Sequence, residues 1–113
     1  MRLRTLAATL LVALTTVVLV TATFAAPANA VSMRTWSRLA KCESGGNWHI
    51  NTGNGYYGGL QISPGTWRAH GGKKYASNAH RASKREQVRI AKRIKRSQGW
   101  GAWPSCSRRI GAR

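Results

Sequence analysis

The sequence predicts one small, mainly α-helical domain that contains one disulfide bond and at most a minimal β-hairpin. Four observations support this prediction. Apolar residues recur at helical spacing in two separate segments, and a stretch rich in glycine and asparagine lies between them. The chain also has only two cysteines, Cys42 and Cys106, and its 113 residues suffice for a single domain.

The first thirty residues (1–30) have the pattern of a signal peptide. A positive start, Arg2 and Arg4, precedes an apolar run over residues 6–20, and Ala28-Asn29-Ala30 has the small-x-small form of a cleavage site. We therefore expect a secreted protein whose mature domain comprises residues 31–113. An uncleaved membrane anchor is the alternative, because the long stretch after Arg4 is uncharged.

Export makes a Cys42–Cys106 disulfide the expected state of the two cysteines. They reach an oxidising compartment, and two cysteines allow only one pairing. The chain-entropy model values such a loop at about 4 kcal/mol, which matters for a domain with a modest core. Two separate buried thiols are the alternative.

The charge balance is extreme, with nineteen lysines and arginines against two acidic residues and a net charge of +17. Such a chain repels copies of itself and adheres to polyanions, so we expect a monomer. Nucleic acid would be the first candidate partner for an intracellular protein. For an exported protein we expect no nucleic acid, and instead the anionic polymers of a cell wall or anionic lipid surfaces.

The first predicted helix runs from Ser32 to about Cys42, because apolar residues share one of its faces. That face comprises Trp36, Leu39, Ala40 and Glu43. Residues 43–59 then hold six glycines and three asparagines, which predicts turns. Aromatic residues among these glycines indicate an ordered stretch, and a short β-hairpin around Asn54-Gly55 is expected there.

Two more helices have recognisable start signals. Ser63-Pro64 is typical of a helix cap followed by a first-turn proline, and this short helix should end at Gly71-Gly72. Ser83-Lys84-Arg85-Glu86 is a capping box, which predicts a helix to about Ser97 that stops at Gly99. Its predicted inward positions are Val88, Ala91 and Ile94 or Lys95, and its outward positions are Arg89, Lys92, Arg93 and Arg96.

Glu43 is the candidate catalytic residue. It lies on the apolar face of the first helix near the C-terminal end, where desolvation and the helix dipole both disfavour its ionised form. A carboxylic acid with a raised pKa suits protonation of a glycosidic oxygen. The surrounding positive charge opposes this shift, and an ordinary solvated glutamate is the alternative.

The remaining polar residues exclude other chemistries. Glu86 is explained by its capping box. The histidines His49, His70 and His80 lack metal-ligand spacing, and no aspartate or free cysteine accompanies them, so we expect neither a metal nor another cofactor. A serine-hydrolase triad is excluded because no carboxylate remains to orient a histidine.

Aromatic residues predict a sugar-binding groove. Five tryptophans and three tyrosines all lie in the predicted mature domain, and rings with amides and hydroxyls bind sugars well. Trp36 is expected in the core. Tyr56 and Trp67, which stand near Gln61 and Thr66, are expected to line the groove.

Three long segments resemble the resuscitation-promoting factor domain of actinobacteria. They are CESGGNW at residues 42–48, INTGNGYYGGLQ at residues 50–61 and QGWGAWPSC at residues 98–106. The resemblance extends over residues 36–111. Glu43-Ser44 followed by Gly59-Leu60-Gln61 is also similar to the first two motifs of lytic transglycosylases.

The resemblance implies a lysozyme-like fold, peptidoglycan cleavage, Glu43 at the catalytic position and the Cys42–Cys106 bridge. It places Tyr56, Gln61 and Thr66 at positions that line the substrate cleft. Residues 68–96 depart from the family because they are more basic.

We therefore expect a secreted enzyme that cleaves the β-1,4 bond between N-acetylmuramic acid and N-acetylglucosamine. No second carboxylate is free, so Glu43 would act alone as acid and base, as in a lytic transglycosylase; a lysozyme-type glycosidase is the other chemistry. Expected partners are glycan strands, anionic wall polymers and other wall hydrolases. A non-catalytic cationic wall-binding module and a membrane-active peptide are the competing functions.

Overall fold

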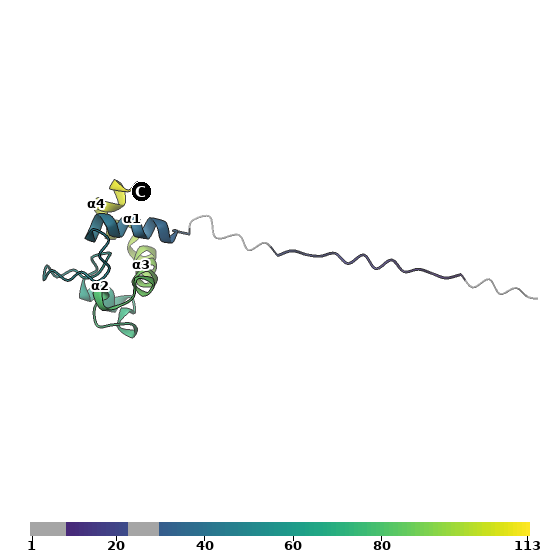
Figure 1. Ribbon diagram of the computed structural model, residues 1–113, viewed down its shortest axis with the longest axis horizontal. Coiled ribbons are helices and arrows are strands. Elements are labelled where there is room, and N and C mark those ends of the chain that lie inside the picture. Colours follow the sequence, from purple (N-terminus) through teal and green to yellow (C-terminus); the bar gives the residue numbers. More distant parts are fainter. Residues whose placement is uncertain (1–8, 23–29) are drawn as a thin grey trace, which may run out of the picture.

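Helices form the framework of the domain (Figure 1). The computed structural model describes residues 9–22 and 30–113. Within these residues the elements are α1 (Met33–Ser44), α2 (Pro64–Ala69), η1 (Gly72–Lys74), η2 (Ala79–Arg81), α3 (Lys84–Gln98), η3 (Gly99–Ala102) and α4 (Pro104–Arg109), where η denotes a 3₁₀ turn. The β structure in this part of the chain is one isolated bridge. The predicted mainly α class of a small lysozyme-like domain is confirmed.

Helix α1 begins as the sequence predicts and ends two residues later. The Ser32 side chain accepts a hydrogen bond from the Thr35 backbone, and Gly45 in the left-handed region ends the helix at φ 67°. The predicted apolar face is confirmed, because Trp36 and its apolar partners on that face are fully buried. Glu43 therefore lies in the last helical turn rather than in the glycine-rich stretch.

Helices α2 and α3 confirm their predicted starts. The Ser63 side chain accepts from the Thr66 N–H, although α2 ends at Ala69, before the predicted glycines. Ser83 and Glu86 form the complete capping box at the start of α3, and Gly99 ends that helix. The inward face of α3 includes the predicted Val88, Ala91 and Ile94, together with Gln87 and Ile90.

Two connections join α1 to the C-terminal part of the chain. Trp36 packs against Trp100 and Trp103, with ring centroids 5.5 Å away in each case. The predicted disulfide between Cys42 and Cys106 is present, with 5.7 Å between the Cα atoms, and it links α1 to α4. Helix α1 is thus joined to the C-terminal part through Trp36 near its start and through Cys42 near its end.

The predicted hairpin around Asn54-Gly55 is wrong. The chain reverses at residues 58–61 instead, where Tyr57 and Ile62 exchange both backbone hydrogen bonds at 3.0 Å. The Asn54 side chain accepts the Tyr56 N–H at 3.0 Å, so this asparagine shapes a local turn rather than a strand pair. Gln61, at φ 51°, completes the actual reversal.

Residues 9–22 form no helix or strand, and their large apolar side chains are exposed. In the described ranges, none of the helices combines the length and the apolar character needed to cross a membrane. The charged start at Arg2 and Arg4, and most of the expected cleavage site at residues 28–30, lie outside the described residues. The signal peptide therefore stays a prediction.

Replacement of Cys106 by serine should lower the free energy of unfolding by about 2–5 kcal/mol, because the unfolded chain loses a cross-link that spans 64 positions. Urea unfolding of the wild-type and Cys106→Ser proteins measures the difference. Ser105→Ala, at an exposed neighbouring position, is the control. An unfolding free energy unchanged in Cys106→Ser would contradict a stabilising role for the bond.

Candidate active site

The buried amide of Gln87 fixes the glycine-rich loop to α3. Its Nε2 donates to the carbonyl oxygens of Trp48 at 2.7 Å and Ala82 at 3.0 Å, and its Oε1 accepts the Gly59 N–H at 3.0 Å. The side chain is fully buried, so Gln87 supplies the hydrogen bonds that these three backbone groups would otherwise have to form with water. Sequence reasoning missed this residue. The available signal was a polar residue one helical turn before Ala91 on the inward face of α3.

Two glycines allow the loop to approach this amide. A Cβ atom at Gly58 would overlap the Gln87 side chain, and one at Gly59 would lie 2.5 Å from the Trp48 ring. Gly58 also has a positive φ of 77°, which favours glycine. The loop therefore reaches one defined position, from which Tyr56 and Gln61 project.

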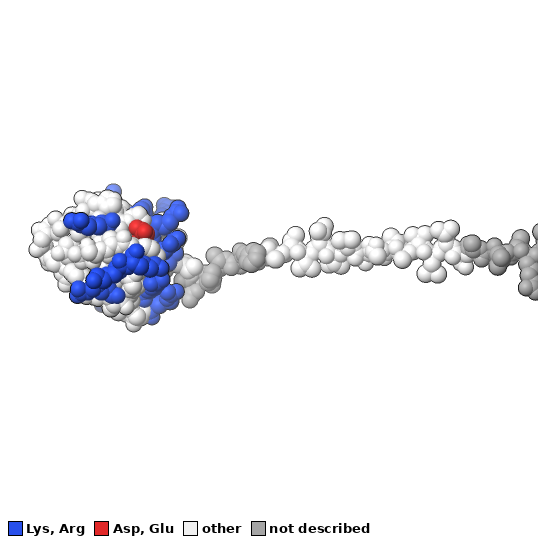
Figure 2. All heavy atoms as spheres, turned by 90° about the horizontal axis from the view of Figure 1, so that it is seen from below, with Lys and Arg blue, Asp and Glu red and all other residues white. Residues whose placement is uncertain are grey.

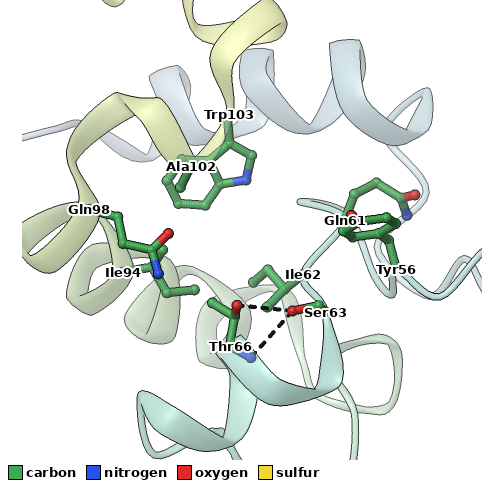
Figure 3. Close-up of a pocket in the computed structure, with 9 residues that line it drawn as sticks. All are labelled: Tyr56, Gln61, Ile62, Ser63, Thr66, Ile94, Gln98, Ala102 and Trp103. Atoms are coloured by element: carbon green, nitrogen blue, oxygen red, sulfur yellow. Dashed lines mark hydrogen bonds between the residues drawn. The ribbon is translucent and has the colours of Figure 1, made fainter.

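A groove runs between this loop, the last turn of α1 and the C-terminal part of the chain. It consists of two adjoining hollows of about 280 and 70 Å³, which share Tyr56, Gln61, Ala102 and Trp103 as walls. Glu43 and Pro104 complete the larger hollow. Figure 3 shows the smaller hollow, whose further walls are Ile62, Ser63, Thr66, Ile94 and Gln98.

Glu43 is the only carboxylate among the side chains that line the groove. It is half-buried in the last turn of α1, beside the disulfide at Cys42. Burial raises the pKa of Glu43, because desolvation penalises the charged form. The other acid, Glu86, accepts the Ser83 N–H at 2.9 Å and is not part of the groove wall.

The structure brings three of the four predicted binding residues to this groove. Tyr56 is 51% exposed, so its ring is available to a ligand. Gln61 is held by a hydrogen bond from Asn54 to its Oε1 at 3.1 Å and by its own donation to the Gly58 carbonyl at 3.1 Å. The Thr66 hydroxyl accepts a hydrogen bond from Ser63 at 2.9 Å.

The prediction that Trp67 lines the groove is wrong. Its side chain is fully buried, and its Nε1 donates to the Ala76 carbonyl at 2.8 Å. Successive residues of a helix point about 100° apart. Thr66 faces the groove, and Trp67 therefore faces the core on the other side of α2.

Several groove residues were missed from the sequence, and Trp103 is the main one. Its indole N–H donates to the Leu60 carbonyl at 2.9 Å, which joins the loop to the C-terminal part of the chain. Ala102 and Gln98 lie on the same side of the groove (Figure 3). All three belong to the segment at residues 98–106 that resembles the known family, and this was the available signal.

The histidines form hydrogen bonds within the fold. His70 contacts the Thr66 carbonyl through Nδ1 at 2.8 Å and the Ser97 hydroxyl through Nε2 at 2.7 Å, while His49 contacts the His80 carbonyl at 2.8 Å. Among the described residues, no three histidine, cysteine or carboxylate side chains form a group that could hold a metal ion.

Comparison with known proteins gives one consistent result. The family model for the transglycosylase-like domain matches residues 30–106. Resuscitation-promoting factors of Corynebacterium glutamicum, Micrococcus luteus and Mycobacterium tuberculosis are 55%, 53% and 61% identical over 80%, 78% and 66% of this chain. The chain spans less than half of these relatives, namely 47%, 38% and 41% of their lengths.

Replacement of Gln87 by leucine should lower the free energy of unfolding by about 2–4 kcal/mol, because three backbone groups lose their partner in a buried place. Gln98→Leu is the matched control, since it makes the same change at an exposed position of α3 and should cost at most about 0.5 kcal/mol. Urea unfolding measures both variants. Equal effects would contradict the assigned role of the buried amide.

Proposed function

The chain belongs to the transglycosylase-like domain family, and from this premise we propose that it cleaves the glycan strands of peptidoglycan. Its resemblance to resuscitation-promoting factors is confirmed by identities above 50%. The bond that we assign to it is the β-1,4 bond between N-acetylmuramic acid and N-acetylglucosamine. The observation that carries the proposal is a groove with one carboxylate, Glu43, whose pKa is raised by burial.

The groove has the composition that a sugar ligand requires. Tyr56 and Trp103 offer ring surfaces, while Gln61, Ser63, Thr66 and Gln98 offer amides and hydroxyls. No lysine or arginine lines either hollow, so the ligand that fits is neutral and polar. A glycan backbone of hydroxyl and N-acetyl groups has this character.

The first half of the reaction uses the protonated form of Glu43. The carboxyl group gives its proton to the glycosidic oxygen as the bond between that oxygen and the anomeric carbon breaks. The leaving sugar departs as an alcohol, and positive charge develops at the anomeric carbon. Desolvation supports this step because it keeps Glu43 protonated at higher pH.

The second half uses the carboxylate that remains. Glu43 accepts the proton of the 6-hydroxyl on the same N-acetylmuramic acid, and that oxygen bonds to the anomeric carbon. No water is consumed, Glu43 regains its proton, and the product end is a 1,6-anhydro sugar. This route needs one carboxylate, whereas the usual glycosidase needs two on opposite sides of the bond.

We also propose that residues 1–30 are removed on export and that residues 31–113 act outside the cell as a monomer. The family match supports this boundary, since it begins at residue 30. The high net charge supports the monomer, because like charges repel.

Glu43→Gln should lose at least about 10²-fold to 10⁴-fold in the rate of glycan cleavage, because the amide cannot donate or accept the proton. Glu86→Gln is the matched control, since glutamine keeps the capping box, and it should cleave at the wild-type rate. Release of soluble fragments from purified peptidoglycan measures the rates. If the wild-type protein releases none but binds the walls, it is a non-catalytic wall-binding module.

The products should carry 1,6-anhydro ends. Mass spectrometry of the released fragments distinguishes the mechanisms, because an anhydro end is lighter than a hydrolysed reducing end by one water. Hydrolysed ends alone would contradict the single-carboxylate route and indicate a lysozyme-type glycosidase.

The pH dependence of kcat/KM should have one limb controlled by Glu43. The active form is the protonated acid, so the rate falls as pH rises through a pKa that burial sets above the ordinary glutamate value. Initial rates on short neutral glycan fragments test this, with the Glu86→Gln profile as the control. A bell-shaped profile, with a second loss of rate at low pH while the protein stays folded, would indicate a second catalytic carboxylate.

A further inference from the structure

Helix α3 packs beside η1 and brings two arginines, Arg93 and Arg89, to this part of the domain. Arg93 Nη1 donates to the His70 carbonyl oxygen at 3.1 Å, at the backbone that leads into η1. Arg89 lies four residues earlier, on the same face of α3. A hydrogen bond from Arg89 is the main cause of a lowered pKa of Tyr75, the residue that ends η1, and Lys74 contributes further.

η1 itself adds two lysines beside the same tyrosine. Lys74 Nζ lies 4.9 Å from the centroid of the Tyr75 ring, and Lys73 precedes it. Both lysines are exposed, as is Arg89, whereas Tyr75 packs its ring against the core. Lys74 and Arg89 thus lie at Tyr75, whereas Arg93 is bonded to the backbone just before η1. Together with Lys73, four cationic groups from two elements gather at η1. We call these groups, Lys73, Lys74, Arg89 and Arg93, the η1 cluster.

Little negative charge opposes the η1 cluster. Of the two acidic side chains in the sequence, Glu43 lines the groove. Glu86 lies one helical turn before Arg89, but its carboxylate accepts the Ser83 N–H. Since only the helix-capping carboxylate of Glu86 lies near the four cations, the cluster is strongly positive. Figure 2 shows a broad band of basic side chains on the face of the domain seen from below in Figure 1, where a single small acidic area is visible.

We propose that the η1 cluster is a binding site for a linear anionic polymer, and that this site is separate from the glycan groove. The arginines are about 6 Å apart along the helix axis, so they can contact successive acid groups of one chain. A guanidinium group binds phosphate or carboxylate through two parallel hydrogen bonds, and the lysines add mobile point charges. The bound polymer is not cleaved, so the site retains the domain on a wall.

The groove and the η1 cluster differ in their lining. The groove has no lysine or arginine in either hollow, whereas the η1 cluster has four cations and no carboxylate of its own. The domain therefore has separate sites for uncharged sugars, in the groove, and for anionic polymers, at the η1 cluster. Attachment at the η1 cluster does not depend on whether Glu43 cleaves a bond.

The test compares charge-matched variants in a Glu43→Gln background, where cleavage cannot alter the ligand. Two site variants are Lys73→Gln/Lys74→Gln and Arg89→Gln/Arg93→Gln. The control is Arg108→Gln/Arg109→Gln, which removes the same charge from exposed positions of α4, on the opposite side of the domain from α2 (Figure 1). The labelled probes are poly(glycerol phosphate), polyglutamate, neutral dextran and random-sequence duplex DNA.

Each site variant should weaken binding of at least one of the two acidic polymers by about tenfold at 0.1 M salt, and the control by less than about threefold. The slope of log affinity against log salt should fall by about one to two units in the site variants. The two acidic polymers distinguish phosphate from carboxylate recognition. Any binding of dextran should be the same in the site variants and the control, because a neutral polymer does not depend on the η1 cluster.

Three results would overturn the proposal. Equal weakening by the site and control variants would mean that net charge alone causes adhesion. A preference for DNA over both acidic polymers would assign the cluster to nucleic acid. A loss confined to the arginine pair, together with a lower melting temperature, would mean that Arg89 and Arg93 stabilise the fold and nothing more. The lysine pair guards against that last effect, since both lysines are exposed and their replacement removes little packing.

Discussion

The amide of Gln87 is the interaction on which the site depends. A loop with six glycines has a large conformational entropy in the unfolded chain, and no regular strand pairing is present to hold it. Gln87 replaces that pairing with three hydrogen bonds from one buried side chain, in a place where an unpaired backbone group is costly. Gly58 and Gly59 are small because the loop must lie directly on this amide and on Trp48. The position of Gln61 follows from that contact.

The opposite wall of the groove is held by different means. Trp36, Trp100 and Trp103 form a cluster that joins α1 to the C-terminal part of the chain, and the disulfide joins the same two parts next to Glu43. Trp103 also donates to the Leu60 carbonyl, so it bonds to the loop that Gln87 fixes. The two walls therefore share one residue. A substitution in the core near Trp103 would move the walls relative to each other. It would therefore change the geometry of the groove around Glu43 without direct contact with that residue.

Local signals in the sequence predict where the helices lie, but they do not predict the contacts between segments that are distant in the sequence. Helix caps depend on residues three positions apart, which is why Ser63 and Ser83 predict the starts of their helices correctly. The role of Gln87 depends on a loop 28 residues away, and burial of Trp67 depends on Ala76 and η1, so neither was visible in a short window. Glu43 could be singled out because only two acids exist and Glu86 has a local explanation. The groove residues of the segment 98–106 could be found only through a family resemblance.

Charge and chemistry occupy different parts of this domain, and the pKa of Glu43 gives the physical reason. A cation close to Glu43 would favour the carboxylate and oppose its use as an acid. In the structure, burial is the cause of the shift, and no lysine or arginine contributes to it. Screening at about 10 Å in 0.1 M salt further isolates the carboxyl group from cations on the outer face. A strongly basic domain can therefore raise the pKa of a carboxylic acid, provided that its cations stay away from the groove. The loop and the segment from the end of η3 to the start of α4 meet this condition, with Tyr56, Gln61, Ala102, Trp103 and Pro104 around Glu43.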